Sequence, residues 1–331
     1  MLSQRCSAWI HKLWYGDNRF RYVLWPAAFI FHGIAWLRRK WLEWWRQPLA
    51  VPIIVVGNLS VGGVGKTPLV IALAQYLTQQ GLRVGIVSRG YGAHLRRFPH
   101  CVQAEDDAWQ VGDEPKLLAL KTNCPVVIAP QRLQAVHYLL QHHQPQVIIS
   151  DDGLQHYAMP RQIEIAVIDG MRGMGSGMCL PAGPLREPVT RLRQVDFIVV
   201  NGEQTEYAQG TKGYQMTLQA GSPHTLTGQS VQWNEIKMPC SAVAGIGHPE
   251  RFFALLQQLG VVCHTYKFAD HHVFLPHDLA NLEKPIIMTE KDAVKCRAFA
   301  TDAMYYLPVE AKLSDEFWTK IRSCIMAHIS M

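Results

Sequence analysis

A glycine-rich segment, GGVGKTP at residues 62–68, is the feature that most constrains what this chain of 331 residues can fold into. It lies between a hydrophobic run at 52–58 and a stretch with helical periodicity at 67–79. Glycines let backbone N–H groups turn toward phosphate oxygens, and the following helix adds the positive end of its dipole. In such a loop the lysine contacts the β- and γ-phosphates, and the next hydroxyl ligates Mg²⁺. The segment predicts a nucleotide-binding loop formed by Ser60, Val61, Gly62, Gly63, Val64, Gly65, Lys66 and Thr67.

The match to the pattern G-x-x-x-x-G-K-[ST] is imperfect, because Ser60 occupies the position of the first glycine. A glycine-rich turn beside a lysine can also be purely structural. The strand–loop–helix context favours phosphate binding over that alternative.

Strand and helix segments alternate from residue 52 onward. The sequence predicts strands at 52–58, 84–88, 125–129, 147–150, 163–169 and 196–201, and helices at 67–79 and 131–142. A polar stretch with one β-like run at 214–218 precedes further strands near 241–247, 261–266, 286–288 and 303–307 and helices near 250–259 and 314–328. Strands separated by helices indicate a mostly parallel sheet covered on both faces. We therefore expect an α/β fold with a nucleotide-binding domain at 51–205, a linker at 206–238 and a smaller α/β domain at 239–331.

The first 50 residues carry the basic excess of the chain. Eight lysines and arginines face two acidic residues there, an excess equal to the net charge of +6 of the whole chain. Seven of the ten tryptophans lie in the same segment. A nucleic-acid-binding protein usually carries its basic excess on the folded body, so no nucleic-acid partner is expected.

Ile30, Ile34, Leu37, Trp41 and Trp44 recur at helical spacing in this segment, beside cations at 38–40 and 46. The apolar run at 22–37 is shorter than the ~20 residues that span a bilayer, and no signal-peptide cleavage site follows it. Such a helix lies in the headgroup plane, with aromatic rings at the boundary and cations toward anionic lipid. Residues 1–50 are therefore predicted to associate with a membrane surface. The alternative is a helix that packs its aromatic stripe on the folded domain.

Asp151 and Asp152 come directly after the apolar run at 147–150. In a nucleotide-binding fold, an acid at the tip of a neighbouring strand completes the magnesium site. Carboxylates also occur at the ends of strands simply because the loops that follow are exposed to solvent. The phosphate-binding loop elsewhere in the chain favours the metal site.

Two further motifs leave alternatives open. GDEP at 112–115 offers two carboxylates, or a helix start with Asp113 as N-cap and Pro115 in the first turn. DHH at 270–272 reads equally as a metal pair, an acid–base pair or a surface turn. Adjacent histidines on an extended strand point to opposite faces, so His271 and His272 are poor partners for one metal.

Eight motifs in this order resemble the tetraacyldisaccharide 4'-kinase family, whose members phosphorylate the lipid A precursor. They are VGNLSVGGVGKTP (56–68), SRGYG (88–92), VGDEP (111–115), SDDGLQH (150–156), LPAGPLREP (180–188), AGIG-x-P (244–249), FADHHVF (268–274) and TEKDAVK (289–295). The resemblance covers nearly the whole chain. The family commonly has Ser or Thr at the position of Ser60, so the departure there puts little in doubt.

The resemblance implies transfer of the γ-phosphate of ATP to the 4'-hydroxyl of a tetraacylated glucosamine disaccharide 1-phosphate. It also implies two α/β domains joined by a β-ribbon, ATP and Mg²⁺ on the first domain, and the lipid disaccharide between the domains. The expected location is the cytoplasmic face of the inner membrane, held peripherally or by the N-terminus. Eight cysteines without a C-x-x-C pair agree with a reducing cytosol. A monomer is expected.

Site residues follow from the resemblance by matching motif positions. Lys66 and Thr67 are implied to bind phosphate and magnesium, and Asp113 supported by His271 is implied to act as the base, with His272 as the alternative histidine. The remaining implied positions are Asp151, Asp152 and Glu114 around the metal, and Arg186 and Glu187 near the reacting phosphate.

Two rival functions use the same fold. A regulatory or metal-delivery GTPase or ATPase shares the phosphate loop, but guanine readers usually need an [NT]-K-x-D motif, and TEKD at 289–292 places the lysine directly before the aspartate. In a membrane-bound scaffold that merely retains a nucleotide-binding fold, the carboxylates Asp113 and Asp151 would have no function. Nucleotide hydrolysis that does not depend on lipid favours the GTPase, and absence of nucleotide binding favours the scaffold.

Overall fold

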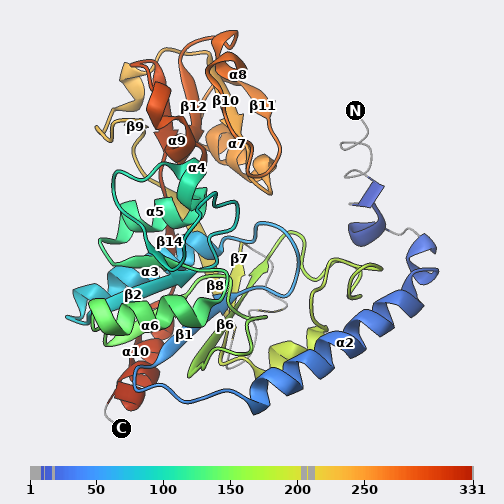
Figure 1. Ribbon diagram of the computed structural model, residues 1–331. Helices are drawn as coiled ribbons and strands as arrows, with labels where there is room; N and C mark the ends of the chain where they lie inside the picture. The colour runs from blue at the N-terminus through green and yellow to red at the C-terminus, as the bar shows by residue number, and fades with distance from the viewer. Residues whose placement is uncertain (1–8, 11, 17–18, 203–206, 208–212, 330–331) are drawn as a thin grey trace. The chain divides into compact units, whose positions relative to one another are not determined.

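The structure is a computed structural model that describes residues 9–329 apart from 11, 17–18, 203–206 and 208–212 (Figure 1). The chain divides into two compact units built from separate segments of sequence. The first unit comprises Met1–Lys66, Pro145–Thr217 and Leu313–Met331, and the second comprises Thr67–Gln144 and Leu218–Lys312. The expected domain boundaries stay predictions, and the parts of the N-terminal segment at 1–8 and of the linker at 206 and 208–212 lie outside the described residues.

Five parallel strands form the sheet of the first unit, in the order β8-β7-β6-β1-β5. Their bounds are β1 (Ile53–Gly57), β5 (Val147–Ser150), β6 (Ile163–Asp169), β7 (Phe197–Asn201) and β8 (Gly213–Ala220). β1, β5 and β6 are buried along their whole length. Parallel strands covered on both faces consist of continuous apolar runs, which is why these segments could be predicted from hydrophobic density alone.

The C-terminal helix α10 (Asp315–Ile329) belongs to the same unit. Its Phe317 is fully buried, and the ring lies 5.7 Å from that of Phe197 in β7 and 5.3 Å from that of Tyr214 in β8. These edge-to-face contacts anchor the helix on the sheet. The expected final helix at 314–328 is confirmed.

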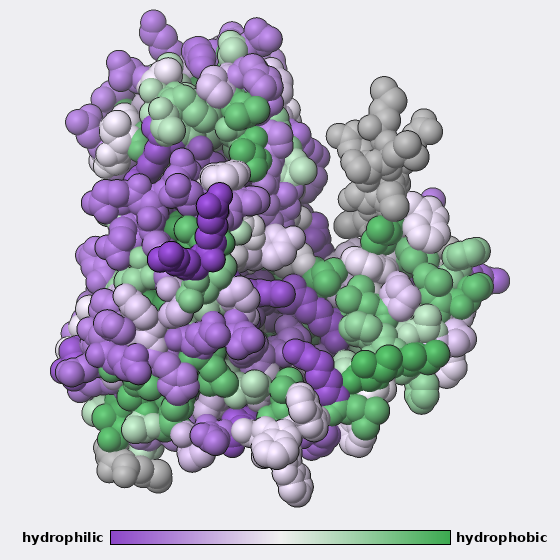
Figure 2. Space-filling model, viewed as in Figure 1, coloured by the Kyte–Doolittle hydropathy of each residue, from purple (hydrophilic) through white to green (hydrophobic). Residues whose placement is uncertain are grey.

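Helix α2 (Trp25–Trp44) leaves its apolar stripe in solvent. Among its described residues only Ala28 is buried, whereas Ile34, Leu37 and Trp41 are 62%, 62% and 64% exposed. Figure 2 shows hydrophobic side chains gathered along this helix. The alternative in which the stripe packs on the folded domain is therefore wrong. Within the described ranges, none of the helices has the length and apolar content needed to cross a bilayer.

The second unit begins with strands β2 (Val84–Ser88) and β4 (Val126–Ile128), which pair in parallel, and β3 (His100–Cys101), which pairs antiparallel with β4. Helix α3 (Lys66–Gln79) starts at the unit boundary and buries Leu69, Leu73 and Leu77 on one face. The other helices of this part are α4 (Ala108–Val111), α5 (Asp113–Thr122) and α6 (Arg132–His142).

A five-stranded sheet completes the second unit, in the order β11-β10-β12-β13-β9. Its strands are β9 (His224–Thr225), β10 (Cys240–Ala244), β11 (Cys263–Lys267), β12 (Ile286–Thr289) and β13 (Met304–Leu307), and all pairs are parallel except β13 with β9. Successive side chains of β10 enter different cores: Val243 joins Phe274 and Met288, while Ala242 and Ala244 join Phe252. The elements still to be named here are η3 (Trp233–Glu235), α7 (Pro249–Gln258), α8 (Pro276–Ala280), α9 (Glu290–Cys296), η4 (Arg297–Phe299) and β14 (Val309–Lys312); those of the first unit are η1 (Arg19–Tyr22) and η2 (Val189–Gln194).

The expected mixed α/β fold with a parallel-rich sheet is confirmed. Each strand and helix predicted from the sequence has a counterpart whose ends differ by no more than three residues. The β-like run expected at 214–218 lies in β8 and pairs in parallel with β7.

Candidate functional site

The glycine-rich loop runs from the end of β1 to the start of α3, as predicted. Gly62 and Gly65 adopt φ of 103° and 94°, a left-handed conformation that favours glycine. A Cβ on Gly65 would also lie 2.4 Å from Nδ2 of Asn201, which donates to the carbonyl of Val64 at 3.0 Å. Asn201, at the end of β7, therefore fixes the path of the loop and requires glycine at position 65.

Lys66 is held at the carboxyl end of the sheet by two side chains of the first unit. Its Nζ lies 3.2 Å from Oδ1 of Asn58 and 3.6 Å from Oδ1 of Asp152. Asn58 is fully buried and its amide also donates to the carbonyl of Ser60 at 2.5 Å. One buried amide thus connects the lysine to the start of the loop.

Arg186 lies beside the same carboxylate. Its Nη1 is 3.2 Å from Oδ2 of Asp152 and 3.2 Å from Oε1 of Gln155. Its backbone N–H donates to the carbonyl of Leu59 at 2.6 Å, so this segment runs along the glycine-rich loop. Asp152 consequently has two cationic neighbours, Lys66 and Arg186, and the structure brings together three residues predicted for the site.

Glu187 is buried, with its carboxylate bonded to other side chains of the first unit. It accepts a hydrogen bond from Nε2 of Gln155 at 2.9 Å and one from the hydroxyl of Tyr157. Burial and the charge of Glu187 raise the pKa of Tyr157 to about 12. In this arrangement Glu187 stabilises the loop after β5, and its expected role beside the nucleotide stays a prediction.

Asp113 and His271, 158 residues apart in the sequence, are in contact in the second unit. Nδ1 of His271 lies 3.1 and 3.0 Å from the two carboxylate oxygens of Asp113. The ring of Tyr91, an exposed residue, lies 5.1 Å from the His271 ring. His272 faces another way, with its Nε2 3.2 Å from Oδ2 of Asp278. Of the two histidines left open by the sequence, His271 is the one that contacts Asp113.

Lys291 connects this pair to the neighbouring carboxylate. Its Nζ lies 2.9 Å from Oε1 of Glu114, 3.8 Å from Oδ2 of Asp113 and 3.5 Å from Nε2 of His271. Oδ1 of Asp270 is 3.6 Å away. Oδ1 of Asp270 also lies 3.8 Å from Nε2 of His271, so a cation and a carboxylate both face this nitrogen.

The surroundings of Asp113 favour its charged form. Burial raises the pKa of Asp113, but the hydrogen bond from His271 and the charges of Lys291, His271 and Lys295 outweigh it and lower the pKa to about 2. The hydrogen bond to Asp113 raises the pKa of His271, although burial and Lys291 oppose the rise. Asp113 is therefore a carboxylate at every physiological pH.

The local backbone corrects two details of the sequence interpretation. Asp113 is the first residue of α5 and Gly112 is its N-cap, so the alternative with Asp113 as N-cap is off by one residue. Its Oδ1 still accepts the Glu114 N–H at 2.8 Å. DHH forms a turn instead of an extended strand, and His271 adopts φ of 58°.

The residues expected to bind magnesium are oxygen donors of the kind this cation prefers. Asp151 is buried directly after β5 and Asp152 follows it, whereas Thr67 and Glu114 are the second residues of helices α3 and α5. No group of three or more His, Cys, Asp or Glu within the described residues could hold a metal by itself. Mg²⁺ usually takes one or two carboxylates and completes its shell with phosphate oxygens and water, so the adjacent carboxylates Asp151 and Asp152 of the first unit fit it.

Sequence reasoning missed five residues that position these groups: Asn58, Gln155, Tyr157, Asn201 and Lys291. Asn58, Gln155 and Lys291 lie inside motifs already quoted, VGNLS, SDDGLQH and TEKDAVK. Their place in those motifs was the only available signal, because polar residues in loops have no periodicity. For Asn201 the only signal in the sequence was its position at the end of a predicted strand.

The TEKD segment has a structural role that disfavours guanine recognition. Asp292 is fully buried and accepts hydrogen bonds from the Gly245 N–H at 2.9 Å and the Thr289 hydroxyl at 2.6 Å. A carboxylate committed to these donors is not available to read a base.

Comparison with known proteins gives one consistent result. The model of the family described as Tetraacyldisaccharide-1-P 4'-kinase matches residues 20–326. A tetraacyldisaccharide 4'-kinase of Legionella pneumophila (strain Corby) is 53% identical over 314 residues, which cover 94% of this chain and 96% of the relative. A tetraacyldisaccharide 4'-kinase of Aeromonas salmonicida is 46% identical over 92% of both chains. The crystal structure of LpxK from Aquifex aeolicus in complex with ATP matches with a TM-score of 0.78 and 28% identity, covering 94% of this chain and 99% of the other.

Proposed function

This chain belongs to the tetraacyldisaccharide 4'-kinase family, and on that premise we propose how its own residues perform the reaction of a kinase of lipid A biosynthesis. The reaction transfers the γ-phosphate of ATP to the 4'-hydroxyl of a tetraacylated glucosamine disaccharide 1-phosphate. The observation that supports the assignment of roles is the pair of sites described above: a glycine-rich loop with Lys66 in the first unit, and the Asp113–His271 contact in the second. The transfer of labelled phosphate to the lipid, described in the Discussion, tests it.

The loop of the first unit supplies the groups that bind and neutralise phosphate. Phosphoryl transfer has a loose transition state, so the protein mainly positions groups and stabilises charge on the equatorial oxygens. Lys66 and Arg186 both flank Asp152 and can move from this carboxylate to the more highly charged phosphates. Thr67, Asp151 and Asp152 would hold Mg²⁺ when it is bound, with Glu114 as a further candidate, and the cation would supply charge neutralisation for the phosphates.

Asp113 accepts the proton of the acceptor hydroxyl in this proposal. A sugar hydroxyl loses its proton late in such a reaction, so a carboxylate is an adequate base when it is close and oriented. Nδ1–H of His271 donates to Asp113 and orients it, and Lys291 and Asp270 hold the other side of the imidazole. His271 therefore positions the base, and Asp113 passes the proton on to solvent, because its low pKa favours the carboxylate.

The exposed apolar stripe of α2 supports association with the cytoplasmic surface of the inner membrane, where the lipid acceptor resides. Trp41 and Trp44 are 64% and 84% exposed, and Lys40 beside them is exposed too. A helix with an apolar face and flanking cations binds at the headgroup boundary without spanning the bilayer. No nucleic-acid partner is proposed, and a monomer remains the expected state.

Replacing Trp41, Trp44 and Trp45 with Ser should move the protein from the membrane fraction to the soluble fraction, with vesicle affinity lower by about tenfold or more, because apolar area that enters the bilayer is lost. Sedimentation with anionic vesicles measures this partition. The matched control replaces the same three residues with Leu, which keeps an apolar surface and should keep most of the binding. Equal partition of the Ser variant and the wild type would contradict the proposed membrane association.

A further inference from the structure

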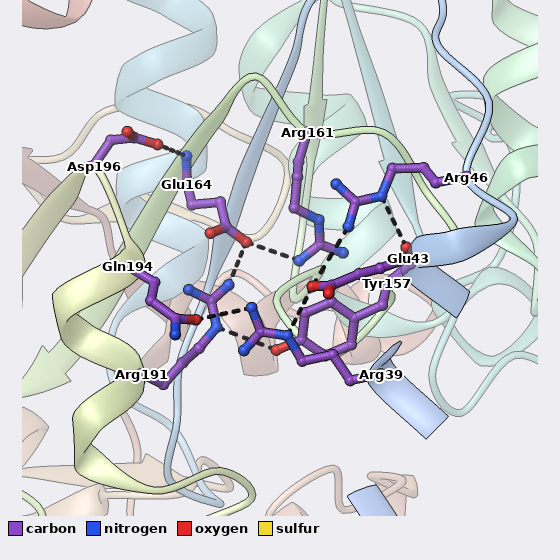
Figure 3. Close-up of a pocket in the computed structure, with 9 residues that line it drawn as sticks. All are labelled: Arg39, Glu43, Arg46, Tyr157, Arg161, Glu164, Arg191, Gln194 and Asp196. Carbon is purple, nitrogen blue, oxygen red and sulfur yellow. Dashed lines mark hydrogen bonds and ion pairs between the residues drawn. The ribbon is translucent and has the colours of Figure 1, made fainter. Parts of the chain in front are cut away.

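A pocket of about 360 Å³ lies in the first unit, between the end of α2, the loop after β5 and helix η2 (Figure 3). α2 contributes Arg39, the chain just after it contributes Arg46, the loop after β5 contributes Tyr157 and Arg161, and η2 contributes Arg191. These segments are distant in the sequence, so the fold itself brings four guanidinium groups together.

All four arginines contact Tyr157, three of them through its ring and one through its backbone carbonyl. The guanidinium carbons of Arg161, Arg39 and Arg191 lie 4.6, 4.7 and 5.9 Å from the centroid of the Tyr157 ring. Nε of Arg46 donates to the Tyr157 carbonyl at 3.2 Å. Burial and the neighbouring charge of Arg161 lower the pKa of Arg46, as expected where like charges are crowded. The pocket therefore concentrates positive charge within a few ångströms.

The carboxylates that line the pocket already have partners. Oε1 of Glu43 lies 2.8 Å from Arg39 and 3.7 Å from Arg46, and Oε1 of Glu164 pairs with the other two arginines. Oδ2 of Asp196 accepts the backbone N–H of Glu164 at 2.8 Å. Four arginines and three carboxylates line the pocket, and a fourth carboxylate, Glu187, lies 3.7 Å from Nε of Arg191 and 4.0 Å from Nη1 of Arg39.

Arg191 gives an independent indication of a missing acceptor. Its side chain is almost fully buried, with 2% exposed; Nε donates to the Tyr157 hydroxyl at 3.2 Å and Nη2 donates to Glu164. Its Nη1 is buried and has no hydrogen-bond partner in the part of the chain that the structure describes. Buried donors are nearly always paired, so an unpaired guanidinium N–H on a residue that lines the pocket favours an acceptor, such as an anion, from outside the described chain.

We propose that this pocket binds the phosphate group of an anionic membrane phospholipid. Guanidinium groups match phosphate oxygens with paired N–H donors, and four of them converge here. Arg39 lies in α2 and Arg46 directly after it, and Leu37 and Trp41 of this helix are exposed. A helix lying at the headgroup boundary places its polar side at the level of lipid phosphates. The inference rests on the proposed membrane association, and it adds a specific headgroup site beneath the apolar stripe.

The experiment compares two charge-matched variants by sedimentation with vesicles of phosphatidylcholine, with and without phosphatidylglycerol. The pocket variant is Arg39→Gln with Arg46→Gln, and the control variant is Arg38→Gln with Lys40→Gln, which removes two exposed cations from the same helix. The gain in affinity that phosphatidylglycerol gives the wild type should fall by about tenfold in the pocket variant and by no more than about threefold in the control. Thermal unfolding of each variant shows whether it is folded. If the double variant is not folded, Arg46→Gln alone replaces it as the pocket variant.

Equal losses in the two variants would contradict the pocket and leave only diffuse attraction, with the membrane association intact. A wild type that binds neither kind of vesicle would contradict the membrane association as well. Inorganic phosphate added without vesicles distinguishes the source of the phosphate. If it raises the unfolding temperature of the wild type but not of the pocket variant, while phosphatidylglycerol makes no difference, the pocket takes a soluble phosphate and the lipid proposal is wrong.

Discussion

Lys66→Ala should lower the rate of phosphate transfer by about 10²–10³-fold or more, because the ammonium group neutralises charge that develops on the transferred phosphate. Its Nζ contacts Asn58 and Asp152 at the edge of the sheet and takes no part in the hydrophobic core. The variant should therefore stay folded, with an unfolding temperature close to that of the wild type. Single-turnover transfer from labelled ATP measures the effect.

Lys40→Ala is the control for the removal of one positive charge outside the glycine-rich loop, since Lys40 is exposed and lies on α2. It should transfer phosphate to a detergent-dispersed acceptor at nearly the wild-type rate. A Lys66→Ala variant that turns over within a few-fold of the wild type would show that the loop does not bind the reacting phosphate.

Asp113→Ala and His271→Ala should each reduce turnover by about 10²–10⁴-fold, as expected for loss of a general base or of the group that orients it. The double variant should lose much less than the product of the single losses, because residues that act as a unit are not additive. ATP affinity should change little in either single variant, since the pair acts on the acceptor hydroxyl. Losses that multiply in the double variant would show that the two residues act independently.

His272→Ala is the matched control for this pair. It removes the adjacent imidazole, whose partner is Asp278, and leaves the Asp113–His271 contact in place. Turnover of this variant should stay within a few-fold of the wild type. If His272→Ala were as damaging as His271→Ala, the assignment from the 3.0 Å contact would be wrong.

The two pKa shifts also fix how pH acts on this contact. The pKa of Asp113 is lowered to about 2, so its contribution to stability is complete above the unfolded value of about 3.9 and is lost as pH falls toward about 2. The pKa of His271 is raised, so its contribution is complete below about 6.5 and is lost as pH rises through the folded value. The contact is therefore most stabilising in mildly acidic solution.

Strands and helices could be predicted from the sequence where their burial requires a regular pattern of apolar residues. β1, β5 and β6 are buried throughout and read as short apolar runs, so their positions were predicted closely. The loop at 60–67 was predicted because its glycines and lysine have fixed spacing between a strand and a helix. The apolar stripe of α2 was also predicted from periodicity, because its aromatic residues recur at helical spacing. Unlike the strands, it stays exposed in the structure.

The supporting groups of the site could not be predicted in the same way. Lys291 meets Glu114 and Asp113 only because segments some 177 residues apart come together in the second unit. Asn201 contacts the glycine-rich loop across 137 residues of sequence. A single polar residue leaves no periodic signal, and its partner is set by the tertiary fold. Arg39 and Arg46 of the α2 pocket belong to the basic cluster noted in the sequence, whereas Arg161 and Arg191 were missed for the same reason.

The most direct test of the central claim is to incubate the protein with γ-labelled ATP and the detergent-dispersed tetraacylated disaccharide 1-phosphate, and then to locate the label. The label should be found on the lipid, at the 4' position, and its transfer should require Mg²⁺ and be absent with Lys66→Ala. Label that appears only as free phosphate, at a rate that does not depend on the lipid, would contradict it and favour a nucleotide hydrolase.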